Sequence, residues 1–280
     1  MLPIKKLYID SRSKSSDSVS HTDFQIDLPT TLLMPENSGF YLTDVSIPIS
    51  WFMIDNGNNK LYFKLYYPDT HETLANAWTV TIPKGDYNVA TLAEAMQTHM
   101  NLIVHNGAHI PDIDQHTFSF EVTPIVELNA IQIFTNNKQV QFKILTNDEL
   151  NNESNITKPL NSLNEMLQNY TISDYNTIWY SDYVNLHPIR NLYICSPNLG
   201  TFSTMSMNGD RTIIKKVPVS ANYNEMIIDQ NIYTGLDFID CSRQTLSRLE
   251  FKLKDHSGNI MNLNGNYWSF SSIFGKIPEE

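Results

Sequence analysis

Alternation of apolar and polar residues at period two is the feature that most limits what this 280-residue chain can fold into. Phe24, Ile26 and Leu28 alternate with polar residues, and the same pattern recurs at 61–66 and at 248–255. Such alternation places apolar side chains on one face of a strand and polar side chains on the other. The chain is therefore predicted to consist mainly of antiparallel sheets that pack against each other.

The C-terminal segment shows this pattern most clearly. The strand expected at 248–255 is followed by a turn at 256–259, a short run at 260–263, a second turn at Asn264-Gly265 and a final strand at 267–274. Asn-Gly favours tight turns because both residues tolerate positive φ. We therefore predict a terminal hairpin that belongs to the core of the fold. The side chains expected to anchor it are Trp268, Phe270, Phe251 and Leu253.

The N-terminal part of the chain also reads as strands. We expect one at 4–10, a serine-rich loop at 11–20 that is mobile, a second strand at 24–28 and a long third strand at 40–54. Because proline cannot donate a hydrogen bond to a neighbouring strand, Pro48 should confine the third strand to an edge or bend it.

The middle of the chain changes period. After a strand at 78–82, apolar residues recur at three- and four-residue spacing from Asn88 to about Asn106, which predicts an amphipathic helix capped by Asn88. Strands are expected at 117–122, 130–135 and 140–145, and a second helix at 159–168 with Pro159 at its first position. Strands resume at 189–195, 211–219 and 225–229.

This distribution predicts a mainly β fold with an α+β insertion. The fold class that fits best is an eight-stranded antiparallel jelly-roll sandwich, although another β-sandwich remains open. The jelly roll would be discontinuous and comprise residues 1–75 and 171–280. Residues 76–170 would form the α+β insertion domain.

The charge balance argues against direct binding to nucleic acid. The formal net charge is −11, from 30 acidic and 19 basic residues, whereas affinity for a phosphate backbone requires a basic surface. The pairs Lys5-Lys6 and Lys215-Lys216 are interpreted as solvated strand edges. No apolar stretch is long enough to span a membrane, and the first residues do not have the layout of a signal peptide. Cys195 and Cys241 are expected to be buried free thiols, as in a reducing compartment.

No motif of a known catalytic or cofactor site is present. Glycine-rich phosphate loops, nucleophile elbows and the His-Glu-x-x-His metal motif are all missing from the sequence. His99, His105 and His109 form a histidine cluster, but Asn106-Gly107 should end the helix between them. The acidic pairs Asp112/Asp114 and Asp237/Asp240 fit ordinary loops. We therefore expect no enzyme activity, and no catalytic, cofactor or metal residues.

Four aromatic residues leave one binding hypothesis open. Trp51, Phe52, Tyr66 and Tyr67 could stack sugars on an outer surface, as in jelly-roll lectins, or pack in the core and in subunit interfaces. Packing is the preferred interpretation.

Several motifs, in a fixed order, resemble one family of viral proteins. The opening 8–12, the serine-rich loop and 24–29 are similar to the start of penton proteins of virophages and polinton-like viruses. An Ile-Pro at 47–48 and an Ile-Asp-Asn at 54–56 follow as in that family, and 82–87 precedes a helix in the same way. The end resembles it best, at 249–255 and 263–270, whereas 163–167 lacks the Leu-Gly-Phe step of the family pattern.

The resemblance implies a structural virion protein. It would be a penton capsomer that forms homopentamers at the five-fold vertices of an icosahedral capsid, beside a double-jelly-roll major capsid protein. Assembly would take place in the host cytoplasm or a viral factory. Two alternatives remain: a virion-borne receptor- or glycan-binding jelly-roll module, and a minor capsid protein that cements neighbouring capsomers. The residues of the subunit interface are not assigned.

Overall fold

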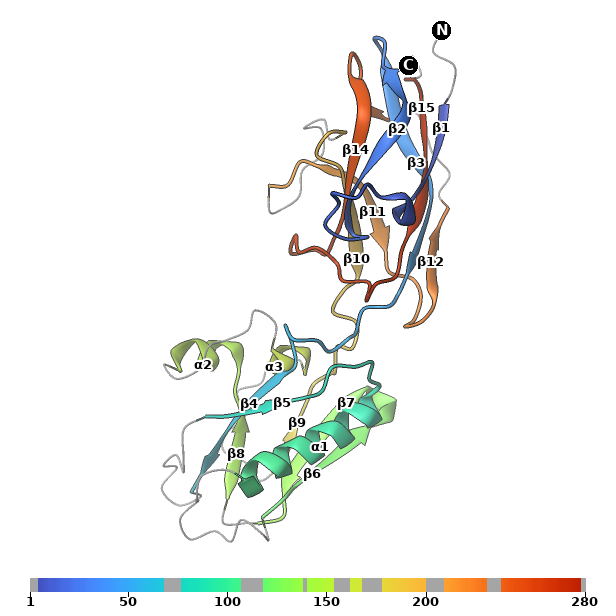
Figure 1. The fold of residues 1–280 in the computed structure, drawn as a ribbon. Coiled ribbons are helices and arrows are strands. Elements are labelled where there is room, and N and C mark those ends of the chain that lie inside the picture. Colours follow the sequence, from blue (N-terminus) through green and yellow to red (C-terminus); the bar gives the residue numbers. More distant parts are fainter. Residues whose placement is uncertain are drawn as a thin grey trace. The chain divides into compact units, whose positions relative to one another are not determined.

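The chain divides into two units, each with its own hydrophobic core (Figure 1). The sandwich unit contains Met1–Trp51 and Ile189–Glu280, and the inserted unit contains Phe52–Pro188. The computed structural model describes residues 5–67, 77–106, 118–137, 140–153, 162–167, 178–199, 209–230 and 238–277.

Two antiparallel sheets form the sandwich unit. The first has the order β1 (Lys5–Asp10), β15 (Ser269–Lys276), β3 (Ser38–Pro48) and β12 (Met226–Asp229), and the short β13 (Ile239–Asp240) also pairs with β3. The second has the order β11 (Ile213–Pro218), β10 (Asn191–Cys195), β14 (Thr245–Lys254) and β2 (Asp23–Leu33). A short 3-10 helix, Ser11–Ser13, follows β1.

The topology of these sheets is a jelly roll, as predicted. When the eight described strands of at least four residues are numbered in chain order, the first sheet reads 1-8-3-6 and the second reads 5-4-7-2. The N-terminal and C-terminal strands are neighbours, and most connections cross from one sheet to the other. Pro48 is the last residue of β3, which lies inside the first sheet and not at its edge.

The predicted terminal hairpin is wrong. β14 and β15 lie in opposite sheets, and only Ile260, after the turn at 255–259, folds back to form an isolated bridge with Lys254. The chain then crosses the sandwich before β15 begins. The alternating pattern could not show this, because a hairpin partner and a strand of the facing sheet both direct apolar residues to the same core.

The four residues expected to anchor the core are all buried in it. Trp268 is 1% exposed, and its ring lies 5.9 Å from Phe24 and 5.0 Å from Phe270, measured between ring centroids. Across the sandwich, the rings of Phe270 and Phe251 meet edge to face at 4.8 Å. These contacts join β2 and β14 of one sheet to β15 of the other.

The inserted unit contains two three-stranded sheets and the helices. One sheet has the order β5 (Trp78–Thr81), β4 (Lys60–Tyr66) and β8 (Gln141–Ile144). The other has the order β6 (Phe120–Ile125), β7 (Ala130–Thr135) and β9 (Ile178–Tyr180). The helices are α1 (Val89–Asn106), α2 (Asn147–Asn152) and α3 (Leu163–Met166), together with the 3-10 turn Val126–Leu128.

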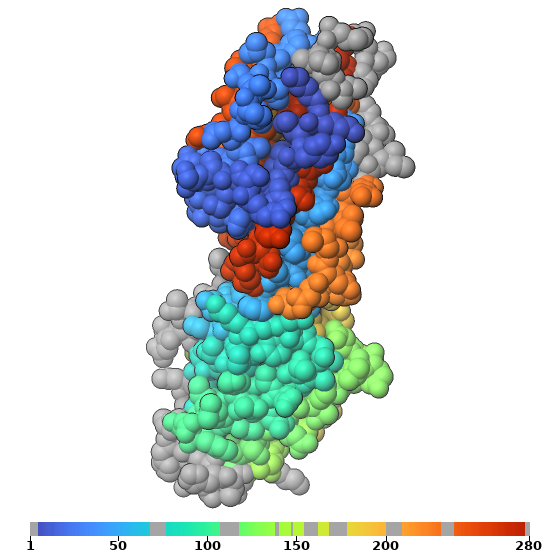
Figure 2. All heavy atoms as spheres, turned by 45° about the vertical axis from the view of Figure 1, so that its right-hand side comes forward, coloured from blue at the N-terminus to red at the C-terminus, as the bar shows by residue number. Residues whose placement is uncertain are grey.

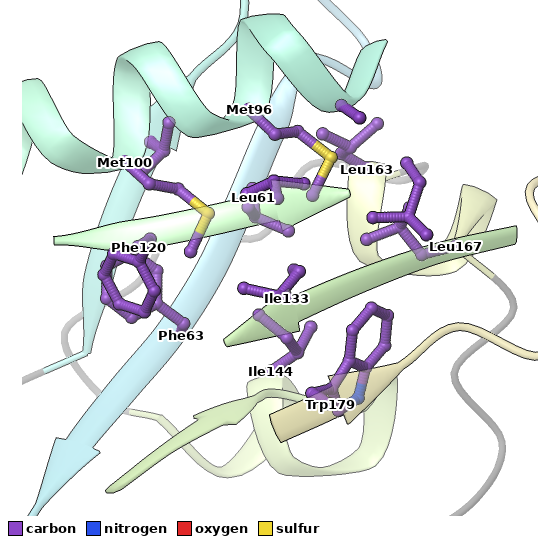
Figure 3. Close-up of a cluster of buried hydrophobic side chains, with 14 of the residues drawn as sticks. Leu61, Phe63, Met96, Met100, Phe120, Ile133, Ile144, Leu163, Leu167 and Trp179 are labelled. Atoms are coloured by element: carbon purple, nitrogen blue, oxygen red, sulfur yellow. The ribbon is translucent and has the colours of Figure 1, made fainter. Parts of the chain in front are cut away.

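Helix α1 supplies one wall of the core of the inserted unit. Met100 extends from it toward Phe120 and Phe63 of the two sheets, and Met96 extends toward Leu61 and Leu163 (Figure 3). The predicted cap is confirmed, because the Asn88 Oδ1 atom accepts hydrogen bonds from the backbone N–H groups of residues 90 and 91, at 3.0 and 2.9 Å. The change from period two to a helical period therefore predicted α1 correctly.

The second predicted helix, at 159–168, is described only in part. Its described part is α3, which begins after Ser162, and Pro159 lies outside the described residues. The buried Asn164 side chain accepts a hydrogen bond from the Tyr62 N–H and donates to the carbonyl oxygens of Tyr62 and Leu145, each at 2.8 Å. This amide joins the helix to β4 and to the residue that follows β8.

The boundaries of the insertion also differ from those predicted. Residues 52–75 and 171–188, assigned from the sequence to the jelly roll, belong to the inserted unit together with 76–170. The strand predicted at 61–66 is real, but β4 pairs with β5 and β8 and with no strand of the sandwich. Alternation indicates that a segment is a strand, but it does not identify the partner strand.

Because each unit has its own core, the inserted unit should be separable. Replacing residues 52–188 with a Gly/Ser linker should leave a soluble β protein, since domains with their own cores can fold alone. Far-ultraviolet circular dichroism and cooperative unfolding in urea would test this. Aggregation of every such protein, over a series of linker lengths, would show that the sandwich depends on the insertion.

Truncation of Trp268 should destabilise the sandwich strongly. Trp268→Ala should cost about 3–5 kcal/mol of unfolding free energy, because it removes a buried aromatic side chain and leaves a cavity. Lys252→Ala, on the outer face of β14, should cost less than about 1 kcal/mol, as is usual for an exposed ion pair. Equal shifts in the urea midpoints of the two variants would contradict the assignment of these faces.

Candidate interaction surfaces

The residues considered for metal or acid chemistry do not come together in the described part of the chain. His105 hydrogen-bonds the Phe118 carbonyl oxygen through Nε2, at 3.0 Å. His109, Asp112, Asp114 and Asp237 lie outside the described residues. Within the described ranges, no three His, Cys, Asp or Glu side chains are grouped so that they could hold a metal ion. Asp240 accepts hydrogen bonds from the N–H and the hydroxyl of Ser242, which is a role in a turn.

The aromatic residues considered for sugar stacking belong to different units. Trp51 packs against the core of the sandwich unit, whereas Tyr66 is buried in β4 of the inserted unit. Among the described helices, none is both long and apolar enough to cross a bilayer.

Both cysteines are buried free thiols, as predicted. Burial raises the pKa of Cys195 to about 11 and the pKa of Cys241 to about 12. Since the thiolate is the reactive form, these side chains are poor nucleophiles at neutral pH.

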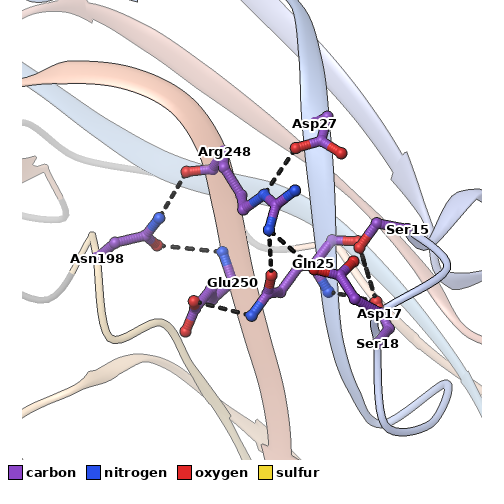
Figure 4. Close-up of polar contacts among 8 residues, drawn as sticks. All are labelled: Ser15, Asp17, Ser18, Gln25, Asp27, Asn198, Arg248 and Glu250. Carbon is purple, nitrogen blue, oxygen red and sulfur yellow. Dashed lines mark hydrogen bonds and ion pairs between the residues drawn. The ribbon is translucent and has the colours of Figure 1, made fainter.

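The outer face of the second sheet carries charges that are paired with one another. Arg248 on β14 donates from Nε to Asp27 at 2.7 Å and from Nη1 to Asp17 at 3.0 Å (Figure 4). Gln25 on β2 accepts a hydrogen bond from Arg248 and donates one to Glu250, each at 3.0 Å. Cross-strand pairs of this kind satisfy the charges of the sheet internally.

The pairing continues along β14. Lys252 contacts Asp23 at 3.3 Å, and Lys254 contacts Asp210 at 2.6 Å. Burial alone would raise the pKa of Asp210, but hydrogen bonds from Lys254 and Thr212 outweigh it and bring the value to about 2. This carboxylate therefore stays ionised under all ordinary conditions.

The serine-rich loop covers the free edge of β2. In place of the mobile segment that the sequence predicted, Ser15 donates its N–H to the Gln25 carbonyl oxygen at 2.8 Å, and Ser20 donates to that of Asp23 at 3.0 Å. The Ser18 hydroxyl accepts the Gln25 N–H at 2.9 Å. At the start of β2, the backbone groups that would otherwise be open to another strand are thereby occupied.

At the other side of the sandwich, where β11 and β12 lie, an ion pair joins the two sheets. Lys215 of β11 contacts Asp229 of β12 at 2.8 Å, and the two side chains are only 9% and 11% exposed. The prediction of a solvated lysine pair is therefore wrong for Lys215, whereas Lys216 is exposed. The strand pattern could not reveal that β11 and β12 lie at the same side of two facing sheets.

The outer face of the first sheet differs in kind from that of the second. Part of its centre carries hydroxyl side chains around Asp44, which accepts hydrogen bonds from Thr43 at 2.8 Å and Ser271 at 3.1 Å, and Tyr41 and Ile273 lie further along the same face. Large apolar side chains are exposed at its two edges: Tyr8 on β1 is 79% exposed, and Met226 and Ile228 on β12 are 48% and 61% exposed. These residues were not predicted from the sequence, although three consecutive apolar residues at 226–228 already indicate a strand that is apolar on both faces.

The architecture is thus a single jelly roll with an α+β unit inserted between its third and fourth long strands. No family model and no curated protein sequence matches the chain. Solved structures do. The mavirus penton protein is similar over 98% of this chain and 99% of its own, with a TM-score of 0.56 and 11% sequence identity.

A second solved structure agrees. A chain from the cryo-electron microscopy structure of the Sputnik virophage matches 99% of this chain over 98% of its own length, with a TM-score of 0.52 and 12% identity. Both matches extend over the sandwich unit and the inserted unit. The predicted resemblance to virophage penton proteins is therefore confirmed at the level of the fold.

The pairing of Asp210 with Lys254 should make stability depend on pH in the acid range. Because the pKa of Asp210 is lowered from 3.8 to about 2 on folding, its contribution is complete above pH 4 and is lost as the pH falls toward 2. In Asp210→Asn, the unfolding free energy should fall by about 2 kcal/mol less than in the wild type as the pH is lowered over this range. Urea unfolding at a series of pH values measures it. Lys254→Met should remove much of the same dependence, and an unchanged profile in both variants would contradict the assignment.

Proposed function

We propose that this chain is a structural virion protein, a penton capsomer that forms homopentamers at the five-fold vertices of an icosahedral capsid. The observation that carries the proposal is the match in fold to the mavirus penton protein over nearly the whole of both chains. A match of the jelly roll alone would be weaker support, because jelly rolls serve many functions. Here the inserted unit is part of the match as well.

The surfaces of the sandwich suit a subunit of a ring. Five-fold rings require heterologous contacts, in which one side of a subunit meets a different side of its neighbour. The two outer faces of this sandwich are unlike, one being covered by paired charges and the other by hydroxyl and exposed apolar side chains. Exposed apolar residues on an otherwise polar surface are typical of sites that become buried on association.

The second partner in the proposal is a double-jelly-roll major capsid protein, which would surround the pentamer in the shell. The resemblance of the sequence motifs to virophage and polinton-like penton proteins supports this partner, as does the fold. The protein would then reside in the virion after assembly in the host cytoplasm or a viral factory. No catalytic step forms part of the proposal.

The mass of the assembled particle tests the proposal. Native mass spectrometry of the purified full-length protein should give five times the mass of one chain, because a permanent ring buries apolar surface that is exposed in the monomer. The same measurement after addition of the major capsid protein should give that pentamer bound to capsomers. A trimer would favour a receptor-binding head. A monomer in both samples would contradict the pentameric capsomer.

A further inference from the structure

The four edge strands of the sandwich are protected to different degrees. The first residues of the β2 edge are covered by the serine-rich loop. The edge strand β11 carries Lys215 and Lys216, and β1 begins with the exposed Lys5 and Lys6. Lysines on an edge strand discourage that edge from pairing with a second copy of itself, because like charges would then lie opposite each other. Among the four, only β12 has neither a cover nor a lysine in the described residues.

β12 instead presents apolar side chains to the outside. Met226 and Ile228 alternate with the buried Ile227, so both lie on the outer face of the first sheet. The exposed Glu225 precedes them. An exposed apolar edge strand is a site of association unless the protein prevents it.

The other edge of the same sheet has the opposite charge. Tyr8 of β1 projects from the outer face, and the exposed Lys5 and Lys6 precede it. On the outer face, one edge therefore carries Tyr8 and the cation Lys6, and the other carries Met226 and Ile228. Lys5 and Glu225 lie beside them on the opposite face of their strands. Apolar and charged groups are complementary between the two edges.

The two edges are separate patches on one molecule. Figure 2 shows the sandwich from the side of this sheet, where β15 and β3 lie between the dark-blue N-terminal segment and the orange β12. Three inter-strand spacings of ~4.8 Å separate β1 from β12. The arrangement of two different, complementary patches on opposite edges is what a heterologous contact requires.

We propose that the subunit contact of the ring joins the β1 edge of one copy, through Tyr8 and Lys6, to the β12 edge of the next, through Met226 and Ile228. This inference rests on the proposed homopentamer and adds the residues of its interface. The occupant of each edge is a second copy of this chain. The contact is directional, so each subunit uses both edges once and the ring closes without a free edge.

Two variants of the full-length chain test the interface. Ile228→Asp places a charge on the β12 edge, and Tyr8→Asp does the same on the β1 edge. Leu33→Asp is the matched control, since Leu33 at the end of β2 is 69% exposed but lies on the second sheet. By native mass spectrometry, the first two should fall from five chain masses to one, and the control should keep five. Far-ultraviolet circular dichroism and cooperative unfolding in urea would show that all three fold, since loss of the ring alone lowers the thermal midpoint.

A mixture of the two variants tests the direction of the contact. Ile228→Asp keeps an intact β1 edge and Tyr8→Asp keeps an intact β12 edge, so an equimolar mixture should give a heterodimer and nothing larger. A homodimer of Tyr8→Asp alone would overturn the proposal, because β12 would then pair with itself. A mixture that remains monomeric would also overturn it.

The remaining outcomes separate this inference from the proposed function. A wild-type pentamer that survives both edge variants would overturn the interface and leave the pentamer intact. Loss of the pentamer in the Leu33 control as well would overturn the assignment to these two edges. A wild-type protein that stays monomeric would overturn both the pentamer and its interface.

Discussion

Burial of Trp268 between the two sheets is the interaction on which the rest of the sandwich depends. Its ring contacts Phe24 and Phe270, and through them reaches Phe251 of the facing sheet. Its polar atoms are satisfied at the same time, because the indole Nε1 donates to the His21 carbonyl oxygen at 2.8 Å and the backbone N–H donates to the Ser11 hydroxyl at 3.0 Å. The same residue thus fills the core and holds both ends of the serine-rich loop. That loop in turn closes the edge of β2, so core packing and the protection of an edge have a common origin.

The jelly-roll topology explains why a unit of this size can be inserted without disturbing the sandwich. The insertion lies between β3 and β10, which belong to different sheets and do not pair with each other. No ladder of hydrogen bonds crosses the insertion point, so the cost of a longer connection is only the entropy of closing a larger loop, which grows slowly with length. The conformational entropy that the inserted unit loses on folding is offset by burial of its own hydrophobic core, which includes Met96, Met100 and Phe120.

The two outer faces of the sandwich carry different kinds of side chain, although the strands of both sheets alternate in the same way. On the second sheet the outward positions are charged, and they pair across strands, as Arg248 does with Asp27 and Lys252 with Asp23. Such a face is satisfied in water and gains little from association. On the first sheet the outward positions are hydroxyls at the centre and apolar at the edges, where Tyr8 and Ile228 remain exposed. Because the two faces differ chemically, a subunit can present one surface to one neighbour and a different surface to the other, as a closed ring requires.

The sequence by itself favoured the jelly-roll class and predicted most of the strands, the helix capped by Asn88 and the burial of Trp268, Phe270, Phe251 and Leu253, but neither α2 nor β9. These properties are local, because periodicity and capping depend on residues a few positions apart. The tertiary structure alone decided which strands pair. It separated β14 from β15, moved β4 into the inserted unit and joined Lys215 to Asp229. It also left Met226 and Ile228 uncovered at an edge. Two strands with the same alternation present the same apolar face to any partner, so pairing is settled only when the whole core is packed.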